Sequence, residues 1–221
     1  MRGNQQTEYK TVNQFGTAEI VEKKSRFIAS VKPVATEEEA LEFIAELKSK
    51  YWDARHNVYA YIIGDNHIQR YSDDGEPSGT AGIPVLEIIK KEQLQDVAVV
   101  VTRYFGGTLL GAGGLVRAYG KSAKEGLVAA DIVTMKLCDS LKINADYTLL
   151  GKIQNEIGNA GHIIEEIVYR DDITIFVLVH TGETQRFVET MIDITNDRVN
   201  IEKAATKYIA VNEQGKLCSS E

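Results

Sequence analysis

Residues 97–130 read VAVVVTRYFGGTLLGAGGLVRAYGKSAKEGLVAA, and this stretch decides the fold of the first half of the chain. The continuous apolar run at 97–102 is typical of a strand buried on both faces. Five glycines follow among the twelve residues 103–114, and without a Cβ they let the backbone approach a neighbour or a ligand closely. The stretch ends in an apolar stripe at helical spacing, made of Leu115, Tyr119, Ala123, Leu127 and Ala130. It therefore predicts a buried strand, a glycine-rich loop and a helix.

Upstream of this stretch the sequence predicts further strands and two helices. Thr36 and Glu39 have the spacing of a capping box, which marks the start of a helix, and Lys48 and Lys50 suit its C-terminal end. Alternating apolar residues and runs of β-forming residues indicate the strands. The expected elements are a hairpin at 17–34, a helix at 36–50, strands at 56–63 and 68–72, and a helix at about 81–93.

An irregular segment, DDGEPSGTAG at 73–82, interrupts this regular pattern. Most of its positions hold residues that favour turns. Such a run inside a well-patterned domain is often a binding loop, and a plain surface loop is an equally open interpretation. The loop motif comprises Ser72, Asp73, Asp74, Gly75, Glu76, Pro77, Ser78 and Gly79.

The last third of the chain predicts a compact ferredoxin-like domain. The order βαββαβ within about seventy residues is the split-βαβ plan. Alternating apolar and polar residues from Ile163 to Tyr169 indicate a sheet with one solvated face. The expected elements are strands at 140–147, 162–170, 173–181 and 199–210, and helices at 148–160 and 183–196.

Charge divides the chain at about the same place as the predicted folds. Residues 1–137 hold 17 Lys and Arg against 18 Asp and Glu, a net charge of −1, and the rest hold 8 against 14, a net charge of −6. We therefore expect an α/β domain at 1–137, a ferredoxin-like domain at 138–212 and a disordered tail at 213–221.

A total net charge of −7 argues against indiscriminate coating of DNA, because non-specific binding depends on basic residues that neutralise phosphates.

The composition is that of a folded, soluble protein. Hydrophobic residues make up 43% of the chain, which contains 3 prolines, and its longest aliphatic runs are far shorter than the roughly 20 residues that cross a bilayer. The polar N-terminus and two widely spaced cysteines, Cys138 and Cys218, favour a reducing cytoplasm.

Known catalytic motifs do not fit the sequence, so no catalytic residue, metal or cofactor is expected. Gly120-Lys121-Ser122 imitates the end of a phosphate-binding P-loop, but it falls inside the predicted helix and lacks the correctly spaced glycine. A metallopeptidase site would have to be assembled from scattered residues, and the acidic residues at 73–76 are better explained as surface carboxylates in a turn.

The glycine-rich loop predicts an anion site instead. It precedes a helix whose first N–H groups lack partners within the helix and carry the positive end of the helix dipole. The glycines also suit close packing or a positive φ, so a purely structural role stays open. The candidate residues for binding an anion or nucleic acid are Arg55, His56, Arg103, Gly106, Gly107, Gly111, Gly113, Gly114, Arg117, Lys121 and Lys124.

Four segments in order resemble the signature blocks of the YigZ/IMPACT family. They are KSRFIA at 24–29, ARHNVYAY at 54–61, RYSDDGEPSGTAGIPVL at 70–86 and VVVTRYFGGTLLGAGGLVRAYG at 99–120. The resemblance covers the first domain, and the second is similar to the small C-terminal domain of bacterial members. It implies a ribosomal-protein-like α/β fold, as in domain IV of elongation factor G, followed by a ferredoxin-like domain.

The resemblance also implies a non-enzymatic binding role. Eukaryotic members act in translational control, so we expect regulation of translation or of a stress response through contact with RNA, the ribosome or a translation-associated protein. An Xaa-Pro dipeptidase activity sometimes attributed to the family has no support in the motifs. Two alternatives remain, a phosphate-binding enzyme that uses loop 106–114 with a topology like that of GHMP kinases, and a pure protein–protein adaptor.

Overall fold

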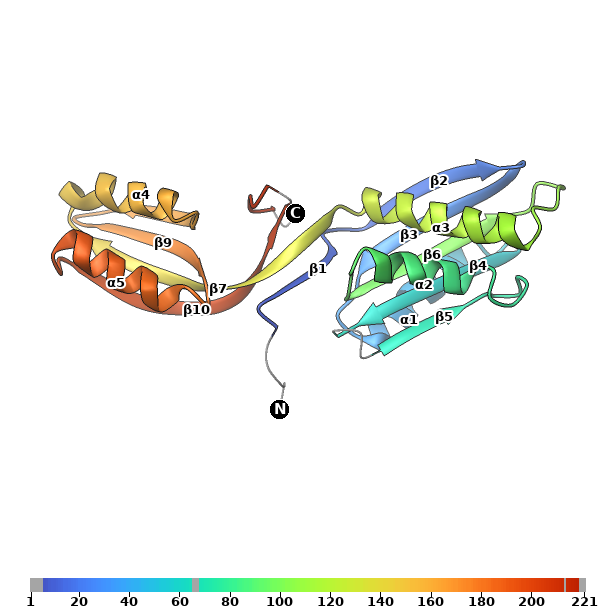
Figure 1. The fold of residues 1–221 in the computed structure, drawn as a ribbon, viewed down its shortest axis with the longest axis horizontal. Helices are drawn as coiled ribbons and strands as arrows, with labels where there is room; N and C mark the ends of the chain where they lie inside the picture. The colour runs from blue at the N-terminus through green and yellow to red at the C-terminus, as the bar shows by residue number, and fades with distance from the viewer. Residues whose placement is uncertain (1–5, 65–67, 213, 219–221) are drawn as a thin grey trace. The chain divides into compact units, whose positions relative to one another are not determined.

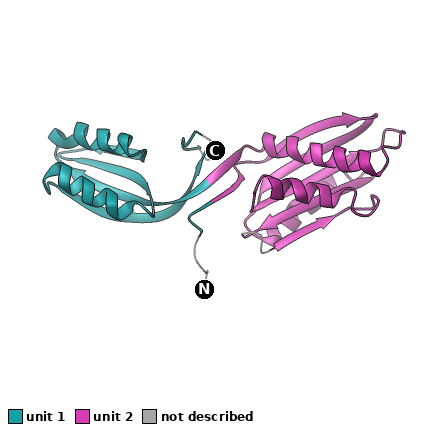
Figure 2. Ribbon diagram, in the orientation of Figure 1, with its two compact units in different colours: residues 1–8, 135–219 teal, residues 9–134, 220–221 magenta. Residues whose placement is uncertain are grey.

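The computed structural model describes residues 6–64, 68–212 and 214–218. Within them, residues 9–134 form one compact unit, the first unit, and residues 6–8 with 135–218 form the second unit (Figure 2). The division falls three residues before the expected boundary. It also assigns residues 6–8 to the second unit, where Leu137 N–H donates to the Thr7 carbonyl at 2.8 Å.

The first unit is built on an antiparallel sheet with β6 in its centre (Figure 1). Residues 97–101 of β6 are fully buried, as the apolar run predicts for a strand covered on both faces. The expected hairpin at 17–34 is present as the pair β2 and β3. The strand order is β2 (Gly16–Glu22), β3 (Ser25–Pro33), β6 (Val97–Tyr104), β4 (His56–Ile63) and β5 (Ile68–Ser72).

Three helices cover this sheet on its two faces. α2 (Gly82–Lys91) and α3 (Ala112–Ala129) pack on one face and bury the larger core, which includes Phe27 and Tyr119. α1 (Glu37–Lys50) packs on the other face. The predicted cap of α1 is confirmed, because the Thr36 hydroxyl accepts a hydrogen bond from Glu39 N–H at 3.2 Å.

The second unit has the strand order β10-β7-β9-β8, which is the order of the split-βαβ plan. Apolar residues such as Ile143 and Ile175 on one face of this sheet form a core with the two helices. The mixed α/β class that the sequence predicts is thus confirmed. The elements are β7 (Ile132–Ala145), a 3₁₀ turn (Tyr147–Leu149), α4 (Leu150–Asn159), β8 (Ile163–Tyr169), β9 (Ile173–His180), α5 (Thr184–Thr195) and β10 (Val199–Val211).

The structure differs from the sequence-based expectations at both ends of the second unit. β7 begins at Ile132 rather than at about 140, because its first part pairs with the unpredicted strand β1 (Glu8–Val12). The disordered tail was expected at 213–221, of which 213 and 219–221 lie outside the described residues, and residues 214–218 are instead folded back. There Asn212 Oδ1 accepts the N–H groups of residues 214 and 216, each at 3.0 Å, in the manner of an Asx turn. No helix in the described part of the chain is long and apolar enough to span a bilayer.

Candidate functional site

The loop at 73–79 is held in place by its own acidic side chains, beginning with Asp73. The Asp73 carboxylate accepts hydrogen bonds from the N–H groups of Gly79, Ala81 and Gly82 at 2.8, 3.1 and 2.8 Å. Since the first N–H groups of a helix lack partners within the helix, this carboxylate caps the start of α2. Asp73 therefore shapes the loop and positions the helix that follows it.

Asp74 joins the same loop to β4 and α1. Its carboxylate accepts from Asn57 N–H at 2.7 Å and pairs with Lys48 Nζ at 2.8 Å. Its backbone carbonyl lies 2.8 Å from His56 Nδ1, and because a carbonyl can only accept, Nδ1 carries the proton of that ring. His56 therefore holds the loop against the end of β4.

Glu76 points into the unit rather than to solvent. Its side chain is 3% exposed, and its Oε1 accepts from Arg103 Nη1 at 2.5 Å and from the Tyr119 hydroxyl at 2.9 Å. His56 Nε2 lies 3.8 Å from the same oxygen. Burial, and then the charge of Glu76, raise the pKa of Tyr119, so this hydroxyl stays protonated and donates. We call His56, Glu76, Arg103 and Tyr119 the buried polar cluster.

Arg103 is the cation of this cluster and is itself 7% exposed. Its guanidinium lies between the rings of Phe27 and Phe105, 5.4 and 5.6 Å from their centroids, and Nη2 donates to Ser25 Oγ at 3.3 Å. Its Nε is buried with no hydrogen-bond partner among the described residues. Arg103 was a candidate for direct contact with an anion, and the structure places it inside the unit, paired with Glu76.

The five glycines of the loop have different surroundings. A Cβ on Gly106 would lie 2.0 Å from the backbone of Lys24, so this glycine permits close packing against the β2–β3 turn. Gly107 and Gly111 have φ of 81° and 72°, which favours glycine. Gly113 has no neighbour within 4 Å of an added Cβ. A Cβ on Gly114 would lie 3.0 Å from Leu110 Cβ, so Gly114 also packs closely. Close packing or a positive φ thus accounts for four of the five glycines, whereas Gly113 is exposed and has no packing role.

The start of α3 is open on its exposed side. The N–H groups of Gly114 and Leu115 donate to the Gly111 carbonyl at 3.1 and 3.0 Å, whereas no described residue accepts from those of Ala112 or Gly113. The carboxylates of loop 73–79 accept hydrogen bonds from other donors of the first unit. None of them is therefore a partner for the N–H groups of Ala112 and Gly113.

Three exposed cations follow along the same helix. Arg117, Lys121 and Lys124 stand at positions i, i+4 and i+7 and so share one side of α3, which we call the basic stripe. Arg55 is also exposed, just before β4. The structure therefore divides the predicted cations into a buried one, Arg103, and four that face solvent.

Tyr119 and Ser25 are members of this site that sequence reasoning did not assign to it. Tyr119 appeared only as part of an apolar helical stripe, and Ser25 only within the expected hairpin at 17–34. A tyrosine in a buried stripe requires a partner for its hydroxyl, which was a usable signal for a buried acceptor. Among the described residues, no three His, Cys, Asp or Glu side chains converge as metal ligands do.

Comparisons with known proteins agree with this division into two units. Residues 23–127 match the Impact N-terminal domain, and residues 143–198 match a domain of unknown function, DUF1949. The chain is 49% identical over 207 residues to IMPACT family member YvyE of Bacillus subtilis, which covers 92% of this chain and 95% of that protein. It is 30% identical to IMPACT family member YigZ of Escherichia coli, over 81% of this chain and 89% of that protein. The chain therefore belongs to the IMPACT family.

Two further comparisons concern a part of the chain and its fold. Protein IMPACT of Rattus norvegicus is 35% identical over 98 residues, which is 42% of this chain and 31% of that protein. A solved crystal structure of a hypothetical protein is similar with a TM-score of 0.58 and 27% identity, over 91% of this chain and 99% of that one. The part shared with eukaryotic relatives thus has about the length of the first matched domain.

Proposed function

We propose that this protein is a non-enzymatic binding protein that contacts RNA in the cytoplasm, free or on the ribosome, and so regulates translation or a stress response. The observation that carries the proposal is the basic stripe of α3 beside the open start of that helix. Membership of a family with eukaryotic IMPACT proteins supports it. The first unit is the part of the chain assigned to RNA contact.

The arrangement of charges supports phosphate binding at this place. Asp73, Asp74 and Glu76 would repel a phosphate if they faced solvent, but each is bonded to protein donors. The cations of the basic stripe are exposed and form no ion pair with a carboxylate among the described residues. A local basic surface can therefore bind phosphate groups, although the net charge of the whole chain is −7.

An anion would bind at the start of α3 through main-chain groups. The N–H groups of Ala112 and Gly113 carry the positive end of the helix dipole, and Arg117 lies just over one turn further on. Gly113 has no close neighbour, so it exposes its backbone to a ligand. Replacing Gly113 with Val should weaken phosphate or RNA binding while the thermal unfolding temperature changes little, because φ at this position is not positive.

The decisive test is charge reversal on the basic stripe. The variant Arg117→Glu/Lys121→Glu should bind a single-stranded RNA oligonucleotide more weakly in fluorescence anisotropy, measured over a series of KCl concentrations. Each lost phosphate contact lowers the log–log salt slope by about 0.7 on single strands, so the slope should fall by about 1.4. The control Lys152→Glu/Arg170→Glu makes the same charge change at exposed positions of the second unit.

Unchanged affinity and slope in the stripe variant would favour a protein–protein adaptor instead. That second function has one observation in its favour, because Leu109 in the glycine-rich loop and Trp52 after α1 are each 82% exposed. Exposed apolar side chains of this size are common at protein interfaces. Ribosome co-sedimentation of both variants distinguishes loss of RNA contact from loss of a protein contact.

A further inference from the structure

A cavity of about 360 Å³ opens in the second unit, and none of its lining residues belongs to the candidate site described above. Its floor is apolar and consists of buried side chains from β7, β9 and β10. The volume lies within the range of about 300 to 1,000 Å³ that is typical of small-molecule sites. The floor residues are Cys138, Leu178, Ile209 and Val211.

His162 lies in the wall of this cavity, and its imidazole ring makes no hydrogen bond to any described residue. Its side chain is 8% exposed and packs edge-on against Phe187, with ring centroids 4.9 Å apart. Its Nδ1 is 3.9 Å from Glu183 Oε2, beyond hydrogen-bond distance, and no other described residue bonds to the ring. Burial lowers the pKa of His162, so at neutral pH the ring presents one N–H donor and one acceptor.

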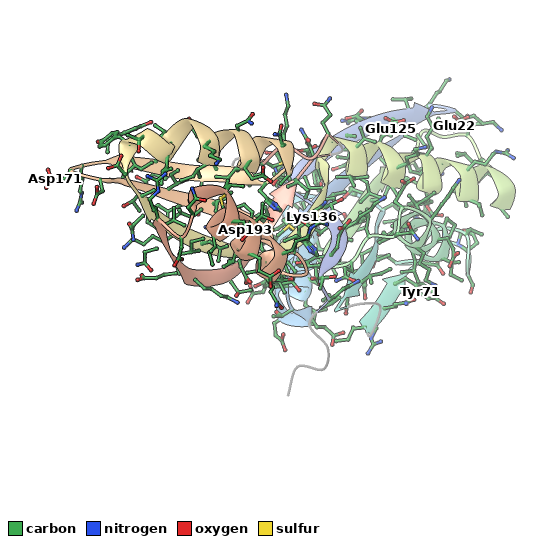
Figure 3. The ribbon with its side chains drawn as sticks, turned by 60° about the vertical axis from the view of Figure 1, so that its left-hand side comes forward. Glu22, Tyr71, Glu125, Lys136, Asp171 and Asp193 are labelled. Carbon is green, nitrogen blue, oxygen red and sulfur yellow. The ribbon has the colours of Figure 1, made fainter. Side chains whose placement is uncertain are left out.

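The ring of His180 supplies a donor on the same side of the sheet. Gly182 N–H donates to His180 Nδ1 at 3.3 Å, so the proton of the neutral ring is on Nε2. His180 is directly opposite Cys138 in the β7–β9 register. Lys136, which is labelled in Figure 3, stands two residues before Cys138 on β7 and so faces the same side of the sheet. It also lines the cavity. Lys136 and His180 thus supply hydrogen-bond donors to the cavity lining.

Carboxylates complete the polar rim. Glu183 is adjacent to His162, so these two supply hydrogen-bond acceptors. Glu8 lies 3.8 Å from Lys136 at the surface, in a half-exposed pair that is worth little in water. The cavity lining therefore combines hydrogen-bond donors, acceptors and an apolar floor.

We propose that this cavity binds a small zwitterion with an apolar side chain, which is the chemistry of an apolar α-amino acid. Lys136 and the Nε2–H of His180 bind the carboxylate, Glu183 and the unprotonated nitrogen of His162 bind the ammonium group, and the side chain lies on the apolar floor. The assignment is independent of RNA binding, because every residue of the site belongs to the second unit.

Isothermal titration calorimetry of the full chain tests the ligand class. L-Leucine and L-phenylalanine should bind. N-Acetyl-L-leucine lacks the ammonium group and L-leucinamide lacks the carboxylate, so each should bind about tenfold more weakly or worse, since each loses a charged hydrogen bond. L-Aspartate should not bind, because its side chain cannot lie on the apolar floor. Absence of heat with leucine and phenylalanine at millimolar concentration, or equal affinity for doubly blocked N-acetyl-L-leucinamide, would overturn the proposal.

Variants of the chain test the assigned residues. Glu183→Gln and Lys136→Met change exposed or half-exposed side chains and should each lower leucine affinity about tenfold without loss of fold. His162→Phe should do the same, with circular dichroism to verify folding. Glu156→Gln is the matched control, because Glu156 lines only the adjoining cavity between α4 and α5. An affinity that falls equally in Glu156→Gln and Glu183→Gln would contradict this assignment.

Discussion

At the scale of single residues, the pair Glu76 and Arg103 has the largest energetic consequences. Both side chains are nearly fully buried, and one carboxylate oxygen serves both Arg103 and Tyr119. Burying two charges is costly, and their attraction and hydrogen bonds offset that cost only while both partners are present. Glu76 thereby fixes the loop, the end of β6 and α3 relative to one another.

Removal of one partner should therefore destabilise the first unit strongly. Glu76→Met leaves Arg103 as an uncompensated buried charge, and we expect a loss of about 3 to 5 kcal/mol in the free energy of unfolding. The double variant Glu76→Met/Arg103→Met should recover a large part of the loss. Differential scanning calorimetry of the full chain measures both.

The exposed pair Glu19 and Arg26 on the β2–β3 hairpin provides the control for this experiment. Glu19→Met should change the unfolding temperature little, because exposed ion pairs contribute little to stability. If Glu76→Met were as mild as Glu19→Met, the cluster would not be the structural connection inferred here.

A second residue-scale prediction concerns pH and Asp139 in the second unit. Burial alone would raise the pKa of Asp139, but hydrogen bonds from Lys203, Thr206 and Thr184 outweigh it and hold the pKa below its ordinary value. The folded state therefore favours the ionised carboxylate. Its contribution to stability is complete above the unfolded pKa of about 3.9 and is lost as pH falls through the lower folded pKa.

Asp139→Asn should consequently weaken the dependence of stability on pH below about pH 4. Urea unfolding followed by circular dichroism at a series of pH values measures the slope. Asp171→Asn, at the exposed β8–β9 turn, is the control substitution. An unchanged slope in Asp139→Asn would mean that the three donors do not favour the ionised form.

Sequence reasoning found the chemistry of these residues but not their partners. Arg103 was expected to contact an anion because it follows a buried strand and precedes a glycine-rich loop. Its partner Glu76 lies 27 positions earlier, in a segment where every carboxylate is next to turn residues. Glu76 and Arg103 come together only because β4 pairs with β6 in the folded sheet. No local sequence pattern predicts that long-range pairing.

At the scale of elements, α3 packs closely on the sheet at Gly126 and loosely against α2 at Gly120. A Cβ on Gly126 would lie 2.7 Å from Ala29 Cβ and 3.0 Å from Val31 Cγ2, whereas a Cβ on Gly120 would meet only Ile88, at 3.8 Å. The helix can therefore approach β3 only because residue 126 has no side chain.

These two glycines give opposite predictions on one helix. Gly120→Ala should stabilise the first unit by about 0.5 to 1 kcal/mol, because alanine has the higher helix propensity and fits the available space. Gly126→Ala should destabilise it, because the clash with Ala29 outweighs the same gain. Thermal unfolding of the two variants in parallel measures the difference, and a similar shift of both would contradict the close approach.

The elements themselves were predictable where local signals were complete. α1 has a capping residue, an acidic first turn and a basic last turn, and its bounds agree with the prediction to one residue. β1 and the first part of β7 were missed, since they pair with each other across more than a hundred residues of chain. Their side chains show no clean alternation, so the register depends on a partner that the local sequence does not reveal.

At the scale of the whole molecule, the division into two units follows from separate cores. The core of the second unit lies between Leu141 and Ile201, and that of the first unit ends at Ile132. The three donors to Asp139 also belong to the second unit. Each unit therefore buries its own apolar surface, which is the physical requirement for independent folding.

The last prediction concerns a fragment of residues 138–212. It keeps the βαββαβ core and should unfold in one cooperative thermal transition, whereas a gradual, non-cooperative profile would mean that the second unit depends on the first. It loses the Leu137–Thr7 and Thr181–Leu137 backbone bonds and the bond from the Tyr208 hydroxyl to Gln6. Each lost bond contributes about 1 kcal/mol, and each kcal/mol shifts the unfolding temperature of a domain of this size by about 4 to 8 °C. The fragment should therefore unfold about 10 °C or more below the temperature at which the second unit unfolds in the full chain.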